Sequence, residues 1–231
     1  MANRQIVVIG LGRFGSSVAF TLYQMGHDVL ALETDEALVQ EAMGRVTYSV
    51  RADATQENVL RELGVPNFDM AVVAIGSNVE ASIMATVLLK SMGIPYIVAR
   101  ARTQLHGRTL ERVGADVVVH PEQETGQHVA RSLFHPEVQD YMEVGPNFVV
   151  SMVRTSAQAV NRTLKDMGLT GARDKYGLAV LAIRRGQDVI LLPAEDERIH
   201  TEDTLVLASR EELLDRLRET GLAQLNGARE G

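Results

Sequence analysis

Three closely spaced glycines near the N-terminus carry the clearest chemical signal in the chain. Gly10, Gly12 and Gly15 belong to the segment Gly-Leu-Gly-Arg-Phe-Gly, which directly follows an apolar run at residues 6–9. In such a segment the first glycine permits a tight turn, the second lets backbone N–H groups approach a pyrophosphate, and the third lets the next helix pack against the strand. The phosphates would lie at the N-terminus of that helix, where free N–H groups and the helix dipole favour anions.

An acidic residue follows at the distance where such a site recognises a ribose. A second apolar run at 29–32 ends in Glu33. A carboxylate there, about 20 residues after the glycines, accepts hydrogen bonds from both ribose hydroxyls and repels a 2′-phosphate. The pattern predicts a site for an adenine nucleotide with an unphosphorylated adenosine ribose. The alternative is a core of the same fold whose pocket binds nothing.

Four further charged residues stand at turns near this site, and each has two interpretations. Arg13 suits a terminal phosphate or is an exposed surface arginine. Asp53 accepts a hydrogen bond from the amine of adenine or only closes a turn. Arg100 supplies a second cation or pairs with an acid, and Glu122 is a surface acid or a ligand of a divalent cation. The remaining predicted lining residues are Phe14, Ala54, Ala74, Ile75 and Gly76.

The elements that must position these residues alternate in type along the first half of the chain. Apolar runs predict strands at 6–9, 29–32, 48–52, 71–75, 96–99 and 116–119, with helices between them. This alternation predicts an α/β fold with a Rossmann-like, doubly wound parallel sheet in the order 3-2-1-4-5-6. Thr55 is expected to cap a helix at 56–63.

The pattern changes after residue 123. We expect a Rossmann nucleotide-binding lobe at 1–123, a crossover helix and linker at 124–141, a smaller α+β lobe at 142–222 and a frayed tail at 223–231. The second lobe carries predicted strands at 148–153, 178–183, 189–192 and 204–207, and a helix at 211–219. The segment 185–187 reads as the turn of a hairpin.

Composition excludes several classes of function. The 231 residues contain no cysteine and carry a formal net charge of −7, without a basic stripe, which argues against nucleic-acid binding. The apolar run at 79–89 is too short to span a bilayer, so we expect no direct membrane insertion and a cytoplasmic protein. The six histidines lack metal-ligand spacing, and no catalytic set can be assembled.

Several segments together resemble the KtrA/TrkA family of RCK (regulator of potassium conductance) proteins. They are the glycine turn, Arg-Ala-Asp-Ala-Thr at 51–55, Val-Ala-Ile-Gly at 73–76, Leu-Leu-Lys at 88–90, Gly-Ala-Asp at 114–116, His-Pro-Glu at 120–122, Lys-Tyr-Gly-Leu at 175–178 and Leu-Ala-Ile-Arg at 181–184. The resemblance covers residues 3–218. It is closer to the KtrA type than to tandem TrkA, because one N-lobe and one C-lobe are present. Where many members carry Asp after the second strand, this chain has Glu33.

The resemblance implies a regulatory role. Members form a homo-oligomeric octameric ring of dimers beneath a membrane potassium channel subunit of the KtrB/TrkH type, at the inner face of the membrane. ATP and ADP compete for the cleft, ATP favours the open channel, and some members bind NAD(H). By motif position, Arg13 would reach the γ-phosphate in the neighbouring subunit and Glu122 would hold Mg²⁺ or Ca²⁺. The helix at 124–134 would pack on the partner subunit.

A second ligand is implied for the C-terminal lobe, because some members bind cyclic di-AMP there; Arg173, Lys175 and Pro193 are the candidates. The leading interpretation is a non-enzymatic, nucleotide-binding regulator of a potassium channel. The alternatives are an NAD-dependent oxidoreductase and a standalone redox or nucleotide sensor. The segment after Met142 lacks the acid/base group that a dehydrogenase needs.

Overall fold

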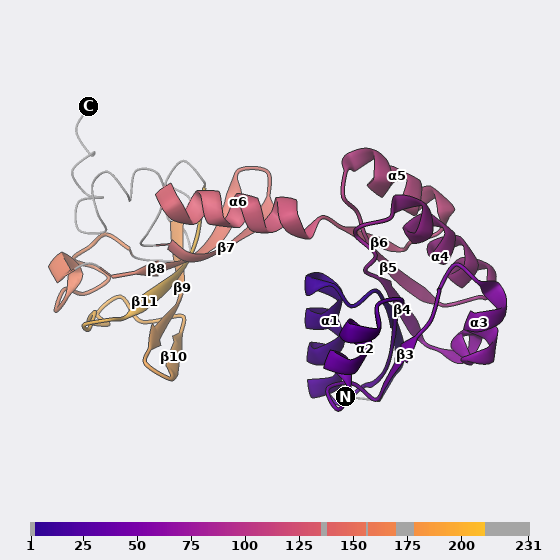
Figure 1. The fold of residues 1–231 in the computed structure, drawn as a ribbon. Coiled ribbons are helices and arrows are strands. Elements are labelled where there is room, and N and C mark those ends of the chain that lie inside the picture. The colour runs from indigo at the N-terminus through magenta and orange to yellow at the C-terminus, as the bar shows by residue number, and fades with distance from the viewer. Residues whose placement is uncertain (1–2, 135–137, 156, 170–177, 211–231) are drawn as a thin grey trace. The chain divides into compact units, whose positions relative to one another are not determined.

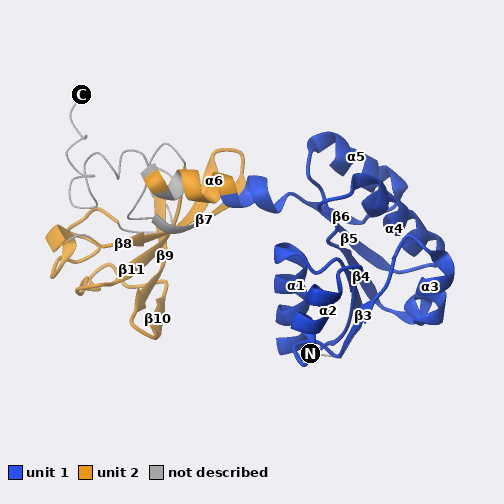
Figure 2. Cartoon of the chain, in the orientation of Figure 1, with its two compact units in different colours: residues 1–125 blue, residues 126–231 orange. Residues whose placement is uncertain are grey.

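The computed structural model describes residues 3–134, 138–155, 157–169 and 178–210. The chain divides into two compact units, residues 1–125 and 126–231 (Figure 2). The division falls within helix α6 (Pro121–Phe134), so one helix belongs to both units. No helix among the described residues is long and apolar enough to cross a membrane.

Unit 1 contains a six-stranded parallel sheet. Its order, β3-β2-β1-β4-β5-β6, confirms the predicted 3-2-1-4-5-6. The strands are β1 (Gln5–Ile9), β2 (Asp28–Glu33), β3 (Tyr48–Arg51), β4 (Met70–Val73), β5 (Tyr96–Arg100) and β6 (Val117–Val119). The direction of strand succession reverses between β1 and β4, which pair with each other.

Helices cover both faces of this sheet (Figure 1). They are α1 (Arg13–Gln24) and α2 (Glu36–Ala42) on one face, and α3 (Glu57–Glu62), α4 (Val79–Ser91) and α5 (Gln104–Val113) on the other, with the short 3₁₀ helix η1 (Val65–Asn67). Alternate side chains of β1 enter opposite cores: Ile6 and Val8 pack with α1, whereas Val7 and Ile9 pack with α4. Burial on both faces explains why the strands are continuously apolar in sequence.

Two helix starts differ from the sequence prediction. Thr55 does not cap α3: Gln56 is the N-cap residue, and the Thr55 hydroxyl donates to the Asp53 carboxylate at 2.7 Å. The nearby carboxylate is the stronger acceptor for that hydroxyl. Helix α6 begins at Pro121, three residues before the expected residue 124, because proline is favoured in the first helical turn. Glu122 is therefore in the first turn of a helix.

Unit 2 contains a five-stranded antiparallel sheet in the order β10-β9-β11-β8-β7. The strands are β7 (Val138–Gly145), β8 (Phe148–Arg154), β9 (Leu178–Arg185), β10 (Asp188–Leu191) and β11 (Thr204–Arg210), with the short 3₁₀ helix η2 (Ala157–Ala159). Strand β7 was not predicted and begins in the expected linker. It is an edge strand that mixes polar with apolar residues, so its sequence pattern is weak. The predicted helix at 211–219 and the tail at 223–231 lie outside the described residues.

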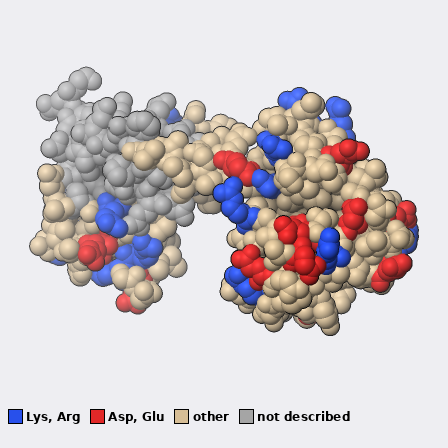
Figure 3. All heavy atoms as spheres, viewed as in Figure 1, with Lys and Arg blue, Asp and Glu red and all other residues tan. Residues whose placement is uncertain are grey.

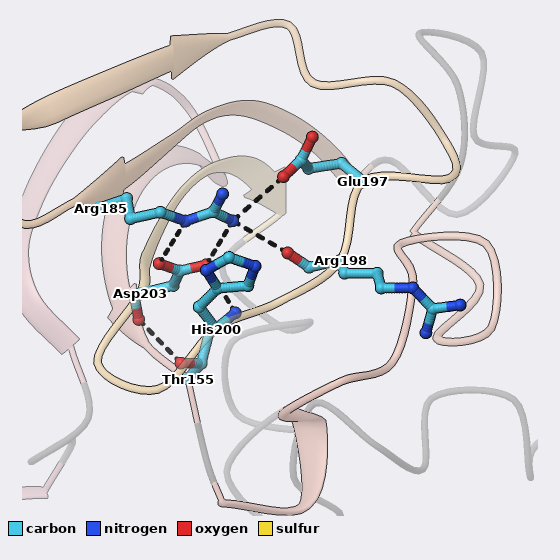
Figure 4. Close-up of polar contacts among 6 residues, drawn as sticks. All are labelled: Thr155, Arg185, Glu197, Arg198, His200 and Asp203. Atoms are coloured by element: carbon cyan, nitrogen blue, oxygen red, sulfur yellow. Dashed lines mark hydrogen bonds and ion pairs between the residues drawn. The ribbon is translucent and has the colours of Figure 1, made fainter.

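A buried carboxylate organises one end of the unit 2 sheet (Figure 4). Asp203, whose side chain is fully buried, accepts two hydrogen bonds from the Arg185 guanidinium, at 3.1 and 2.9 Å. It also accepts the His200 amide at 2.8 Å, and its carbonyl accepts the Thr155 hydroxyl at 2.8 Å. Arg185 also pairs with Glu197 at 3.1 Å. The cluster ties the turn before β11 to the ends of β8 and β9.

Candidate functional site

A cleft of about 840 Å³ lies at the carboxyl ends of the unit 1 strands, where the strand succession reverses. This is the place where doubly wound sheets bind ligands. The structure brings together in it nearly all the residues predicted for the nucleotide and the cation: Gly10, Gly12, Arg13, Phe14, Glu33, Asp53, Ala54, Ala74, Ile75, Gly76, Arg100 and Glu122. Gly15 does not line the cleft.

The glycines differ in what they do for the cleft. Gly10 has φ +96°, which only glycine adopts without strain. A Cβ on Gly15 would lie 1.9 Å from the Gly10 carbonyl oxygen, so Gly15 serves the contact between α1 and the sheet. A Cβ on Gly12 would meet no atom within 4 Å. No contact in the described part of the chain requires glycine at position 12, and its bare Cα leaves open space in the cleft.

The N-terminus of α1 faces this space with its amides available. Gly12 is the N-cap residue and provides no side-chain cap, and the first turn contains no acidic residue. The first N–H groups of a helix have no partner within the helix. They and the helix dipole form a site for an anion such as a phosphate. These features fit the pyrophosphate of a nucleotide.

Glu33 ends β2 and is held rigidly by backbone amides. Its Oε2 accepts the Leu11 N–H at 2.7 Å, and its Oε1 accepts the N–H groups of Thr34 at 2.6 Å and Asp35 at 3.2 Å. Burial raises the pKa of this carboxyl, but the three amides more than offset that effect, so its pKa lies below the ordinary value. Glu33 is therefore ionised at neutral pH, as an acceptor for ribose hydroxyls must be.

Asp53 follows β3 and closes a turn. Its Oδ1 accepts the backbone N–H of Thr55 at 2.9 Å and the Thr55 hydroxyl at 2.7 Å. The hydroxyl and then the amide of Thr55 lower the pKa of the Asp53 carboxyl. Its second oxygen, Oδ2, lies 3.4 Å from the side-chain Nε2 of Gln56, which donates to it. The turn role is thus shown, and the carboxylate still lines the cleft, where it can accept a further hydrogen bond.

Three charged side chains lie at the phosphate end of the cleft. Arg13 is exposed, and its side chain makes no hydrogen bond or ion pair with the described part of the chain. Arg100, at the end of β5, forms an ion pair with Glu122. The alternative in which Arg100 pairs with an acid is therefore the one observed. Its Nε is buried and has no partner among the described residues.

Glu122 would be an isolated metal ligand. No group of three or more His, Asp or Glu that could hold a metal occurs in the described ranges. Mg²⁺ is commonly bound by one or two carboxylates together with phosphates and water. The donor set therefore fits a divalent cation only if a ligand phosphate completes it, and Glu122 would be the protein's contribution.

Additional lining residues come from the helix starts beside these strand ends. Sequence reasoning did not select Thr34, Asp35, Leu38 and Ala81 for the site. The available signal was their position, because residues that begin a helix after a parallel strand face the same edge of the sheet.

Acidic and basic side chains are interspersed on the face of unit 1 shown in Figure 3.

Two of the segments that resemble the RCK family, residues 88–90 and 114–116, contact each other away from the cleft. The Lys90 side chain lies over Gly114, where a Cβ would be 2.5 Å from the lysine Cγ. The ammonium pairs with Asp116 at 3.4 Å, and Asp116 accepts the Ile97 amide at 2.7 Å. This contact joins α4, α5 and β5.

The predicted cyclic di-AMP residues are only partly within the described structure. Arg173 and Lys175 lie outside the described residues. Pro193 is half-buried shortly after β10. The site stays a prediction.

Comparison with known proteins gives matches along nearly the whole chain. The TrkA-N domain matches residues 6–121 and the TrkA-C domain matches residues 149–220. The chain is 36% identical to Ktr system potassium uptake protein A of Bacillus subtilis, over 95% of this chain and 98% of that protein. It is 37% identical to Ktr system potassium uptake protein C of the same organism, over 89% and 91%.

Solved structures share the fold at lower identity. The RCK domain of GsuK matches with a TM-score of 0.54 and 22% identity, over 95% of this chain and 46% of that one. The GsuK channel bound to NAD has a TM-score of 0.53 at 19% identity, over 96% and 39%. GsuK bound to ADP has a TM-score of 0.50 at 17% identity, over 59% and 36%. This chain thus spans less than half the length of those solved chains.

The two Bacillus subtilis relatives are potassium uptake proteins and not dehydrogenases, which agrees with the expectation of a non-enzymatic chain. The sheet orders of both units agree with the RCK fold. The chain therefore belongs to the TrkA-N/TrkA-C family of RCK proteins, with Ktr potassium uptake proteins A and C among its relatives.

Proposed function

We propose that this protein is the nucleotide-binding regulatory subunit of a potassium uptake system. An adenine nucleotide binds in the unit 1 cleft, with its phosphates at the N-terminus of α1 and its ribose on Glu33. One observation carries the proposal. The N-terminus of α1, which has no side-chain cap, and the ionised carboxylate of Glu33 line the same cleft, at the point where the strand order reverses. The Ktr relatives support the potassium-uptake role.

ATP and ADP are the proposed ligands, and NAD(H) is the alternative within the same cleft. Arg13 and Arg100, the latter paired with Glu122, line the cleft, and guanidinium groups suit a chain of phosphates more than a nicotinamide, which is cationic in NAD⁺ and neutral in NADH. The Glu33 carboxylate disfavours a 2′-phosphate. A nucleotide regulates a partner only through different affinities for two conformations of the assembly, and the γ-phosphate that ADP lacks can supply that difference.

The partner is a membrane potassium transporter subunit, which this chain would contact from the cytoplasmic side. We further propose a ring of copies in which Arg13 reaches the terminal phosphate held by a neighbouring copy. The exposure of Arg13, whose guanidinium has no hydrogen bond or ion pair within the described chain, supports this role.

Calorimetric titration of the nucleotide-free full chain with ATP, ADP, NAD⁺ and NADH, with and without Mg²⁺, tests the proposal. We expect micromolar binding of ATP and ADP, with Mg²⁺ strengthening ATP selectively. Glu33→Ala should weaken binding at least tenfold, and Glu36→Gln, three residues further along at the start of α2 and outside the cleft lining, should not. Tight NAD(H) binding without ATP or ADP affinity would instead favour a redox sensor.

A further inference from the structure

Arg100 has hydrogen-bonding capacity that the folded chain leaves unused. Its side chain is only 18% exposed, and its Nε is buried without a partner among the described residues. The guanidinium lies on the backbone of Gly76, where a Cβ would be 2.0 Å from Nη1. A guanidinium has five N–H donors in a planar fork that matches a carboxylate or a phosphate. Arg100 is therefore a pre-positioned anion contact inside the cleft.

The anion that Arg100 contacts in the structure is Glu122. This carboxylate pairs with the guanidinium from the first turn of α6, and its side chain is 60% exposed. The Glu122 carboxyl has a pKa below its ordinary value, mainly because it accepts a hydrogen bond from its own backbone amide. The charges of Arg100 and Arg13 lower this pKa as well. Glu122 is thus ionised, and the charges of both arginines act on it.

A phosphate at the N-terminus of α1 would enter this same group of charges. Gly12, Arg13, Arg100 and Glu122 all line one cleft. A phosphate and the Glu122 carboxylate are both anions that seek the same guanidinium, and placing them together is unfavourable unless a cation lies between them. The arrangement holds an anion of the protein where an anion of the ligand is expected.

We propose that Glu122 is an internal competitor for Arg100, so that a nucleotide phosphate that binds the guanidinium weakens its pair with this carboxylate. The inference rests on the proposed function and adds a property to its site. Glu122, once released, is an unpaired carboxylate beside the phosphates.

The opposite role, in which Glu122 orients Arg100 toward the phosphate, predicts the opposite sign. If Glu122 competes, its removal strengthens binding of a metal-free nucleotide. If Glu122 orients Arg100, its removal weakens that binding. Because Glu122 is mostly exposed, its substitution should leave the fold intact, which circular dichroism can verify.

The experiment is calorimetric titration of the full chain with ADP in EDTA, so that no divalent cation is present. In EDTA we expect Glu122→Gln to bind ADP about fivefold more tightly than the wild type, which corresponds to removing one partly exposed ion pair.

Glu124→Gln is the matched control. Glu124 lies on the same turn of α6, its carboxylate accepts the His120 amide at 3.1 Å, and it does not line the cleft. This variant should bind ADP within twofold of the wild type. Equal or weaker ADP binding by Glu122→Gln in EDTA overturns the competition, as does equal tightening by both variants. If the wild type binds no adenine nucleotide at all, the proposed function fails as well.

Discussion

Two glycine-to-alanine substitutions in one turn should separate folding from ligand binding. In Gly15→Ala the new Cβ would lie 1.9 Å from the Gly10 carbonyl oxygen and 2.9 Å from the Ala74 Cβ, whereas real Cβ contacts stay above 3.0 Å. The N-terminus of α1 or the Gly10 turn must therefore move by about 1 Å, because the carbonyl oxygen belongs to the backbone and the Ala74 Cβ has no rotamer that would carry it away.

The energetic cost follows from two opposing effects. Overpacking of this kind destabilises a protein by about 1–3 kcal/mol. Replacing glycine by alanine within a helix raises the free energy of unfolding by up to about 1 kcal/mol, which offsets part of this loss. We expect Gly15→Ala to lower the free energy of unfolding by about 1–2 kcal/mol and to weaken ADP binding at least tenfold, since the amides of α1 shift with the helix.

Gly12→Ala should behave differently, because its Cβ meets no atom of the chain within 4 Å. Its unfolding free energy should stay within about 0.5 kcal/mol of the wild type, whereas ADP binding falls at least tenfold as the methyl group occupies the space of the phosphate. Urea denaturation and calorimetry measure the two quantities. Gly126→Ala, in helix α6 with open space around its Cβ, controls for the substitution itself.

Either of two results would refute this reasoning. Wild-type stability of Gly15→Ala would show that α1 does not approach the turn so closely. Wild-type ADP affinity of Gly12→Ala would show that no phosphate lies against this backbone.

Three further substitutions test other contacts. Gly76→Ala should push the Arg100 guanidinium from its place and weaken ADP binding about tenfold, with a change in stability below about 1 kcal/mol because that side chain can move. Asp203→Asn should destabilise the fold by about 1–3 kcal/mol at pH 7, since it leaves Arg185 without its buried partner. Burial raises the pKa of Asp203, but the hydrogen bonds from Arg185 and the His200 amide and the charge of Arg185 outweigh burial and hold the pKa below its ordinary value. The stabilisation is therefore full above that value, and the wild type loses it as the pH falls through the folded pKa. Lys90→Ala should cost about 1 kcal/mol, mainly through lost packing on the bare backbone beneath its aliphatic chain.

Each of these predictions has a measurement that can contradict it. Unchanged ADP binding by Gly76→Ala would show that Arg100 does not contact the phosphates. A stability difference between wild type and Asp203→Asn that stays constant from pH 7 to pH 3 in urea denaturation would exclude an ionised Asp203 as its source. A Lys90→Met variant that is as unstable as Lys90→Ala would indicate that the charge, and not the packing, stabilises this contact.

Much of the site could be predicted because local sequence and strand order determine it together. The glycine turn and Glu33 follow β1 and β2 directly, and parallel strands bring their carboxyl ends to one edge. Strand β7 was missed because an edge strand, paired on one side only, needs no strong apolar alternation. The Thr55 cap was wrong because a neighbouring carboxylate took the hydroxyl, a choice that local propensity does not encode.

The sequence by itself determined the sheet order, the candidate cleft and the family, because hydrophobic periodicity and closely spaced motifs are properties of short segments. Only the tertiary structure decided which charges meet. Arg100 and Glu122 are 22 residues apart in sequence. They pair because β5 ends, and α6 begins, at the same edge of the sheet. Likewise, Gly15 and Gly12 belong to one motif, yet packing alone shows that the first serves the fold and the second leaves room for a ligand. Contacts between distant segments depend on the completed fold, and no spacing in the sequence reports them.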